Sequence, residues 1–133
     1  MIGLLYRAAG AIRRRLYADD HGRVGEDLAH RFLRRKGCKV VARNFRSRSG
    51  AGEIDLVAWD GAALAFVEVK TRSSEVCGAP EAAVDAEKRM AIERTAREYA
   101  RRSGVEWDKT RFDIVSVVLQ HPVRIEWLRD AFR

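Results

Sequence analysis

The most constraining feature of this sequence is a pair of adjacent strand segments that carry charges among apolar residues. Residues 53–59 and 64–71 have the β-branched and aromatic content of strands, and Asp60 and Gly61 between them form a dipeptide typical of hairpin turns. Glu68 lies within the second segment, where a buried carboxylate is costly unless it is paired or bound to metal. The fold must therefore place a positive group or a metal ion next to Glu68.

The period of two along a strand indicates which charges share a face. Asp55 lies on one face of its segment with Glu53, and Glu68 shares a face with Lys70. A hairpin loop of two or four residues aligns these two faces, and a loop of four places Asp55 directly opposite Glu68. Cross-strand Cβ atoms are then about 5 Å apart. Two carboxylates at this separation can share one divalent cation.

This arrangement predicts a site for Mg²⁺ or Mn²⁺ that acts on a phosphodiester. Asp55 and Glu68 supply the hard oxygen ligands that these ions prefer, and we expect the backbone carbonyl of Val69 to join them. Lys70 would orient the attacking water or stabilise the developing charge. The alternative is a surface ion pair between Glu68 and Lys70, which is worth little. The matching position of Asp55 favours the metal site.

Hydrophobic periodicity and breakers predict the remaining elements. After a polar break at residues 19–22, the elements are a helix from Arg23 that stops at Gly37, a strand over 39–45, the two strands above, a helix from Asp85 to Gly104, and strands over 112–119 and 123–128. We therefore expect an α/β fold with an α-βββ-α-ββ core and a mixed five-stranded sheet flanked by helices.

The first helix supplies one more acidic candidate. On a helical wheel Glu26 lies at the edge of the apolar arc that contains Leu28 and Phe32, so it can face the sheet. Its neighbour Asp27 lies outside that arc. The alternative for Glu26, a solvated acidic residue in the first turn that complements the helix dipole, fits the pattern equally well.

Composition indicates the partner and compartment. Lysine and arginine number 26 against 19 acidic residues, a net charge of +7, which favours a nucleic-acid partner over a membrane surface. No apolar run has the roughly 20 residues of a membrane span, and the two cysteines, Cys38 and Cys77, form no ligand or disulfide pattern. We expect a cytoplasmic protein with a basic amphipathic extension at 1–18 and one domain at 19–133.

Basic residues near the predicted site are candidates for phosphate contacts. Each of them, taken singly, is also typical of an ordinary solvated charge. The candidates in loops and at element ends are Arg46, Arg48, Arg72 and Arg89.

Several short motifs resemble the YraN family, a group of bacterial proteins placed among the PD-(D/E)xK, or restriction-endonuclease-like, nucleases. The resemblance runs from about Gly22 to Phe132, and its motifs occur in order at the expected spacing. They are GRVGEDLA (22–29), GEIDLVAWDG (52–61), FVEVKTR (66–72), the stretch 84–88 and RFDIV (111–115).

The resemblance implies a nuclease fold and a set of site residues. The superfamily is similar to archaeal Holliday-junction resolvases, which combine a helix glutamate, a strand aspartate and an E-x-K motif; Glu26, Asp55, Glu68 and Lys70 match these positions. Ile54 replaces the proline that often precedes the aspartate. Lys88 matches a helix position where related nucleases often place a polar residue near the site, although a solvated lysine is the alternative.

Two functional hypotheses follow, and a third fits the composition alone. The first is a metal-dependent endonuclease for structured DNA such as junctions or repair intermediates, for which a two-fold symmetric substrate favours a homodimer. The second is a non-catalytic nucleic-acid-binding accessory module in recombination or DNA uptake. The third, an interaction protein with a basic surface, leaves Asp55, Glu68 and Lys70 unexplained.

Overall fold

The first helix occupies residues 21–35 in the computed structural model, which describes residues 21–74 and 85–132 of the chain. The predicted polar break is wrong for His21 and Gly22, because both lie in this helix. The first buried residue of this helix is Gly25, so the turn before it carries no apolar repeat from which the start of the helix could be predicted. The predicted extension at 1–18 lies outside the described residues.

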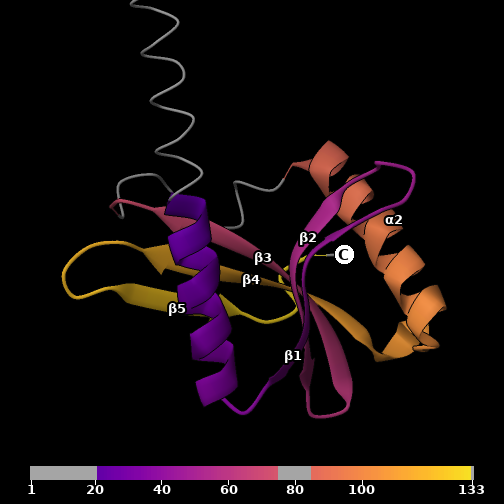
Figure 1. The fold of residues 1–133 in the computed structure, drawn as a ribbon, viewed down its shortest axis with the longest axis horizontal. Helices are drawn as coiled ribbons and strands as arrows, with labels where there is room; N and C mark the ends of the chain where they lie inside the picture. Colours follow the sequence, from indigo (N-terminus) through magenta and orange to yellow (C-terminus); the bar gives the residue numbers. More distant parts are fainter. Residues whose placement is uncertain (1–20, 75–84, 133) are drawn as a thin grey trace, which may run out of the picture.

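Five strands form one mixed sheet, as predicted (Figure 1). Their order in the sheet follows the chain, and every neighbouring pair is antiparallel except β3 and β4. A parallel pair needs a long crossover, and the second helix provides it. The strands are β1 (Lys39–Arg46), β2 (Glu53–Asp60), β3 (Ala63–Arg72), β4 (Thr110–Val118) and β5 (Arg124–Leu128).

Helix α2 (Ala86–Ser103) begins and ends where the sequence predicts. The side chain of Asp85 caps its first turn by accepting a hydrogen bond from the Lys88 N–H, and Gly104 ends it in the left-handed conformation at φ 68°. The 3₁₀ helix η3 (Trp107–Lys109) was not predicted, because three residues carry no periodicity. Within the described ranges, no helix is long and apolar enough to cross a membrane.

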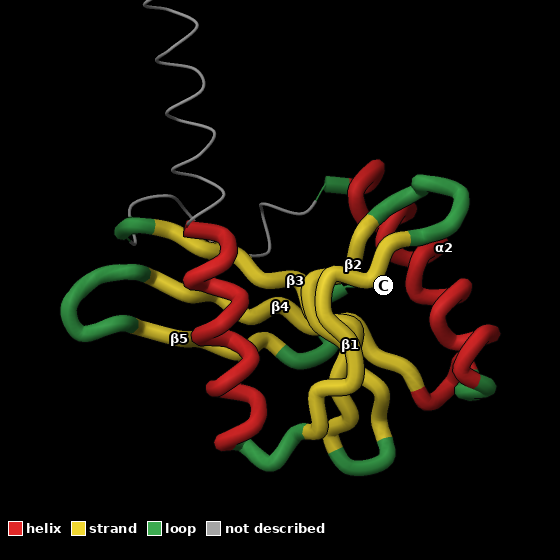
Figure 2. Tube along the Cα trace, in the orientation of Figure 1, coloured by secondary structure: helices red, strands yellow, loops and turns green. Residues whose placement is uncertain are grey.

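The two helices cover opposite faces of the sheet and create two apolar cores (Figure 2). On the α2 face, Ile92 and Ala96 pack against side chains from β2, β3 and β4. On the other face, Ala29 and Leu33 of the first helix pack against the alternate residues of the same strands. Central strands covered on both sides need apolar residues at most positions, so buried polar residues in them call for an explanation.

One buried acidic residue is explained by a structural cluster at the start of β4. Asp113 is fully buried and accepts hydrogen bonds from Nε and Nη2 of Arg111, both at 2.8 Å. Its carboxylate also accepts from Trp127 Nε1 and from the backbone N–H of Asp130, each at 2.9 Å. Four donors compensate the buried charge, and they connect β4 to β5 and to the C-terminal segment.

We expect Asp113→Ala to lower the free energy of unfolding by about 3–5 kcal/mol, because it leaves Arg111 and the Trp127 N–H without their buried acceptor. Urea denaturation measures the loss. Asp108→Ala, an exposed aspartate in η3, should stay within about 0.5 kcal/mol of wild type. A loss below about 1 kcal/mol for Asp113→Ala would show that the cluster is not structural.

Candidate active site

The candidate site lies where β2 and β3 separate. Their antiparallel register runs from Asp60↔Ala63 to Leu56↔Val67, so the next position in line is Asp55 beside Glu68. Beyond it β3 continues in register with β4 alone, and Figure 1 shows the two strands parting. The hairpin loop consists of Gly61 and Ala62, and a loop of two residues is one of the two lengths for which the sequence predicts aligned faces.

Asp55 bridges this separation. Its Oδ2 accepts a hydrogen bond of 2.8 Å from the backbone N–H of Val69 in β3, which replaces a bond of the strand ladder. The bond fixes the carboxylate between the strands and satisfies a backbone donor that would otherwise lack a partner there. Val69 thus contributes its N–H to the site, and a ligand role for its carbonyl stays a prediction.

Glu68 is held by two lysines. The side chain is only 8% exposed, and its Oε1 lies 2.6 Å from Lys88 Nζ and 3.5 Å from Lys70 Nζ. The contact between Glu68 and Lys70 agrees with the predicted pair. Lys88, in the first turn of α2 that Asp85 caps, contacts Glu68 while its side chain stays 43% exposed, so it is both paired and open to solvent.

Glu26 reaches the same region from the first helix. Its side chain is 18% exposed and lies 3.7 Å from Arg43 Nη2. The helix comes close to β3 because Gly25 has no side chain: a Cβ at this position would overlap the hydroxyl of Thr71. Of the two alternatives for Glu26, the structure therefore supports the one that faces the sheet.

Asn44 links Glu26 to Glu53 and was missed by the sequence analysis. With its amide nitrogen directed at the two carboxylates, it donates to Glu26 Oε2 at 3.3 Å and to Glu53 Oε1 at 3.0 Å. Asn44 has a positive φ of 51°, which asparagine tolerates better than most residues, and it lies across from Asp55 in the β1–β2 register. A polar residue inside a strand pattern was its only sequence signal.

The electrostatics of the site leave Asp55 without full compensation. Burial, the negative charge of Glu68 and, less strongly, that of Glu26 raise the pKa of Asp55 from 3.8 to about 7, against the stabilising Val69 N–H. Burial also lowers the pKa of Lys70, as does the neighbouring Lys88. The anionic form of Asp55 would therefore gain from an added cation.

The oxygen ligands at this site suit a hard divalent cation that takes few ligands from the protein. Across residues 21–74 and 85–132, no three histidine, cysteine or acidic side chains are grouped closely enough to hold a metal. The site instead offers the Asp55 and Glu68 carboxylates. Mg²⁺ keeps several waters and is commonly bound through one or two carboxylates, so this pair suffices chemically, although Lys88 must then share Glu68 with the ion.

The predicted phosphate-binding arginines are dispersed. Arg46 is largely exposed and lies 3.5 Å from Glu53, while the backbone N–H of Arg48 bonds to Glu98 of α2. Arg72 is half-buried and donates to Ser116 Oγ at 3.3 Å. Arg46 ends β1, which pairs with the strand of Asp55, and Arg72 ends β3, the strand of Glu68.

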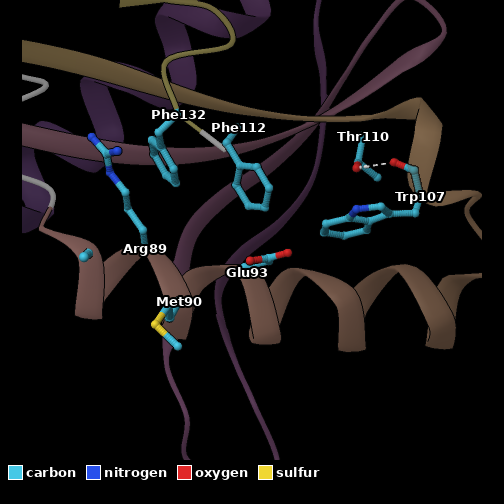
Figure 3. Close-up of a pocket in the computed structure, with 8 residues that line it drawn as sticks. Arg89, Met90, Glu93, Trp107, Thr110, Phe112 and Phe132 are labelled. Carbon is cyan, nitrogen blue, oxygen red and sulfur yellow. Dashed lines mark hydrogen bonds between the residues drawn. The ribbon is translucent and has the colours of Figure 1, made fainter.

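Arg89 belongs to a different cavity, shown in Figure 3. Its guanidinium lies 5.5 Å from the centre of the Phe132 ring, in an aromatic pocket of about 450 Å³ that Trp107 and Phe112 also line. Neither Asp55 nor Glu68 lines this pocket. Lys88 and Arg89 are about 100° apart on the helix, so α2 directs one to the carboxylates and the other to the aromatic rings.

Comparison with known proteins gives a consistent family signal. The profile of the Uncharacterised protein family UPF0102 matches residues 25–117. A UPF0102 protein of Solibacter usitatus (strain Ellin6076) is 66% identical over 132 residues, which cover 99% of this chain and 100% of that protein. UPF0102 proteins of Koribacter versatilis (strain Ellin345) and Rhodococcus jostii (strain RHA1) are 47% and 46% identical, and each alignment covers 84% of this chain and 78% and 94% of the relative.

The raised pKa of Asp55 predicts how stability depends on pH without metal. Between pH 3.8 and about 7 the folded protein binds this proton more tightly than the unfolded chain, so wild-type stability falls as pH rises through that window. Asp55→Asn removes the fall and should be more stable than wild type at pH 8 by up to about 4 kcal/mol, because each pKa unit between 3.8 and about 7 corresponds to about 1.4 kcal/mol.

Urea denaturation in EDTA at pH 4.5 and pH 8 measures this difference, with Asp108→Asn as the exposed control. The difference between Asp55→Asn and wild type should grow with pH, and it should shrink when Mg²⁺ is added, because only wild type gains from the ion. An Asp55→Asn protein that is less stable than wild type at pH 8 in EDTA would contradict the prediction.

Proposed function

The chain belongs to the Uncharacterised protein family UPF0102, and from the residues of its own site we propose that it is a metal-dependent endonuclease that hydrolyses phosphodiester bonds of nucleic acid. The observation that carries the proposal is the convergence of Asp55, Glu68, Lys70 and Lys88 at one end of β3. Maintaining Asp55 in an environment that disfavours its charge costs stability, which is typical of functional sites.

Each residue has a role in this reaction. Asp55 and Glu68 would hold a Mg²⁺ or Mn²⁺ ion, which would supply Lewis-acid polarisation of the phosphate and a more acidic bound water. Lys70, whose pKa is lowered by burial, lies within 3.5 Å of Glu68 and orients that water or stabilises the charge that develops on the phosphate. Lys88 supplies a second positive charge beside the phosphate. Glu26 adds a negative charge near Asp55, which increases the attraction of the site for a cation.

The fold supports the same proposal. An α-βββ-α-ββ core with a helix glutamate, a strand aspartate and an E-x-K motif is similar to restriction-endonuclease-like proteins, including archaeal Holliday-junction resolvases. By this resemblance the substrate is structured DNA, such as a junction or repair intermediate, and the protein works in the cytoplasm. A four-way junction has two-fold symmetry, which a homodimer would match.

One observation favours a second candidate, a non-catalytic nucleic-acid-binding module in recombination or DNA uptake. Lys88 already contacts Glu68 at 2.6 Å, and among residues 21–74 and 85–132 no three acidic, histidine or cysteine side chains are grouped closely enough to hold a metal. A module that only binds would use the lysines as phosphate contacts and would leave the strand intact. The assay below separates these two functions.

The first test is cleavage of end-labelled single-stranded, duplex, flap and four-way-junction DNA in Mg²⁺, Mn²⁺ or EDTA. Wild type should cut at least one of these substrates only with metal. Asp55→Ala and Lys70→Ala should each lower the rate roughly 100-fold or more, because both residues act at the reacting phosphate.

The control variants each remove one charge, as the test variants do, but at positions outside the site. Asp108→Ala and Lys109→Ala remove one charge of each sign from exposed positions in η3 and should cut at the wild-type rate. Metal-dependent cutting that survives both Asp55→Ala and Lys70→Ala would refute the proposed site. Binding without cutting by wild type in every condition would support the non-catalytic module.

A further prediction concerns salt. With a net charge of +7, the protein should bind DNA with an affinity that falls steeply as salt rises, because each phosphate contact releases condensed counterions. Fluorescence anisotropy of labelled duplex DNA in EDTA across a salt series measures the slope. An affinity that is unchanged from low to high salt would count against both nucleic-acid functions.

A further inference from the structure

A small polar cavity, separate from the aromatic pocket at Arg89, lies on the sheet beyond Lys70. It has a volume of about 210 Å³, and neither Asp55 nor Glu68 lines it. It occupies the region where β3 and β4 end and β5 begins, at the left of the sheet in Figure 1. The residues that line it are Arg72, Ser116, Val118, Arg124 and Glu126.

The strand register connects this cavity to the candidate active site. Lys70, Ser116 and Glu126 form one row across three strands, and Arg72, Val118 and Arg124 form the next row. All six lie on the α2 face, because side chains alternate along each strand and Phe66, Ile114 and Leu128 of the same parity pack toward α2. The cavity thus continues the surface that carries Glu68 and Lys70.

The polar lining of this cavity is built into the fold. Ser116 is 1% exposed and interrupts an otherwise apolar stretch of β4, where an alternating core position would ordinarily be apolar. Its hydroxyl accepts a hydrogen bond of 3.3 Å from Arg72 Nη2, which orients a guanidinium that emerges from the end of β3. Arg124 approaches from β5, so two guanidinium groups border one small cavity.

We propose that this cavity binds a backbone phosphate of the nucleic-acid strand, next to the phosphate that is cut at Asp55 and Glu68. The inference rests on the proposed function and adds the path of the strand, from Glu68 past Lys70 to β5. Guanidinium groups bind phosphate oxygens through paired N–H donors, and Ser116 holds one of them in place. Glu126 also lines the cavity, where its negative charge opposes that of the phosphate and limits the affinity.

The opposite signs of Arg124 and Glu126 make the test specific. Binding of labelled duplex and junction DNA to the full chain is measured by anisotropy in EDTA, which prevents cutting, across a salt series. Arg124→Gln should weaken binding roughly tenfold and reduce the salt slope by about one. Glu126→Gln should tighten binding several-fold at low salt.

Matched controls lie outside the cavity at exposed positions. Arg94→Gln on α2 and Glu106→Gln before η3 make the same charge changes and should alter affinity by less than about twofold, because exposed charges at a distance are screened. Arg72→Gln and Ser116→Ala should weaken binding in the same direction as Arg124→Gln. Thermal unfolding monitors whether these two partly or fully buried substitutions retain the fold.

The outcomes separate the cavity from the nuclease proposal. Wild type that cuts DNA, together with an Arg124→Gln protein that binds as tightly as Arg94→Gln, overturns the phosphate subsite and leaves the nuclease intact. Wild type that neither binds nor cuts any DNA overturns both. Weaker binding by Arg124→Gln and tighter binding by Glu126→Gln, each beyond its control, supports the subsite.

Discussion

The hydrogen bond from the Val69 N–H to Asp55 is the interaction on which the rest of the site depends. At this point β3 leaves β2 and pairs with β4, so the backbone donor of Val69 needs an acceptor that no neighbouring strand supplies. Asp55 provides it and is thereby held beside Glu68. One bond thus allows the sheet to open and fixes a carboxylate in the opening, where it is costly to keep ionised.

A buried and a half-buried aspartate in this sheet, Asp113 and Asp55, show how the surroundings decide between structure and function. Asp113 receives four hydrogen bonds, two of them from Arg111, and its charge is satisfied. Asp55 receives one backbone hydrogen bond and faces the negative charges of Glu68 and Glu26. The first arrangement holds β4 and β5 together. The second would gain stability from an added cation, which is the property that the proposed metal-dependent hydrolase requires.

Helices position Lys88 and Glu26 beside this opening. The Asp85 cap fixes the first turn of α2 and with it Lys88, while Gly25 lets the first helix approach Thr71 closely enough to bring Glu26 near. Side chains held by helices and strands are placed more accurately than those on loops. The row from Lys70 across β4 to β5 extends the same rigid surface toward the proposed phosphate subsite.

The sequence by itself determined the two long helices and the five strands in chain order, because strand period, hairpin turns and helix caps are local properties. For a hairpin loop of two or four residues it also aligned the faces that carry Asp55 and Glu68. It also indicated Lys70 as a partner, two residues away on the same strand. Only the tertiary structure decided that Lys88 contacts Glu68, that Asn44 joins Glu26 to Glu53, and that Arg89 lies on an aromatic pocket. These contacts join separate elements, and the rotation and distance of a helix above a sheet follow from packing that no local pattern encodes.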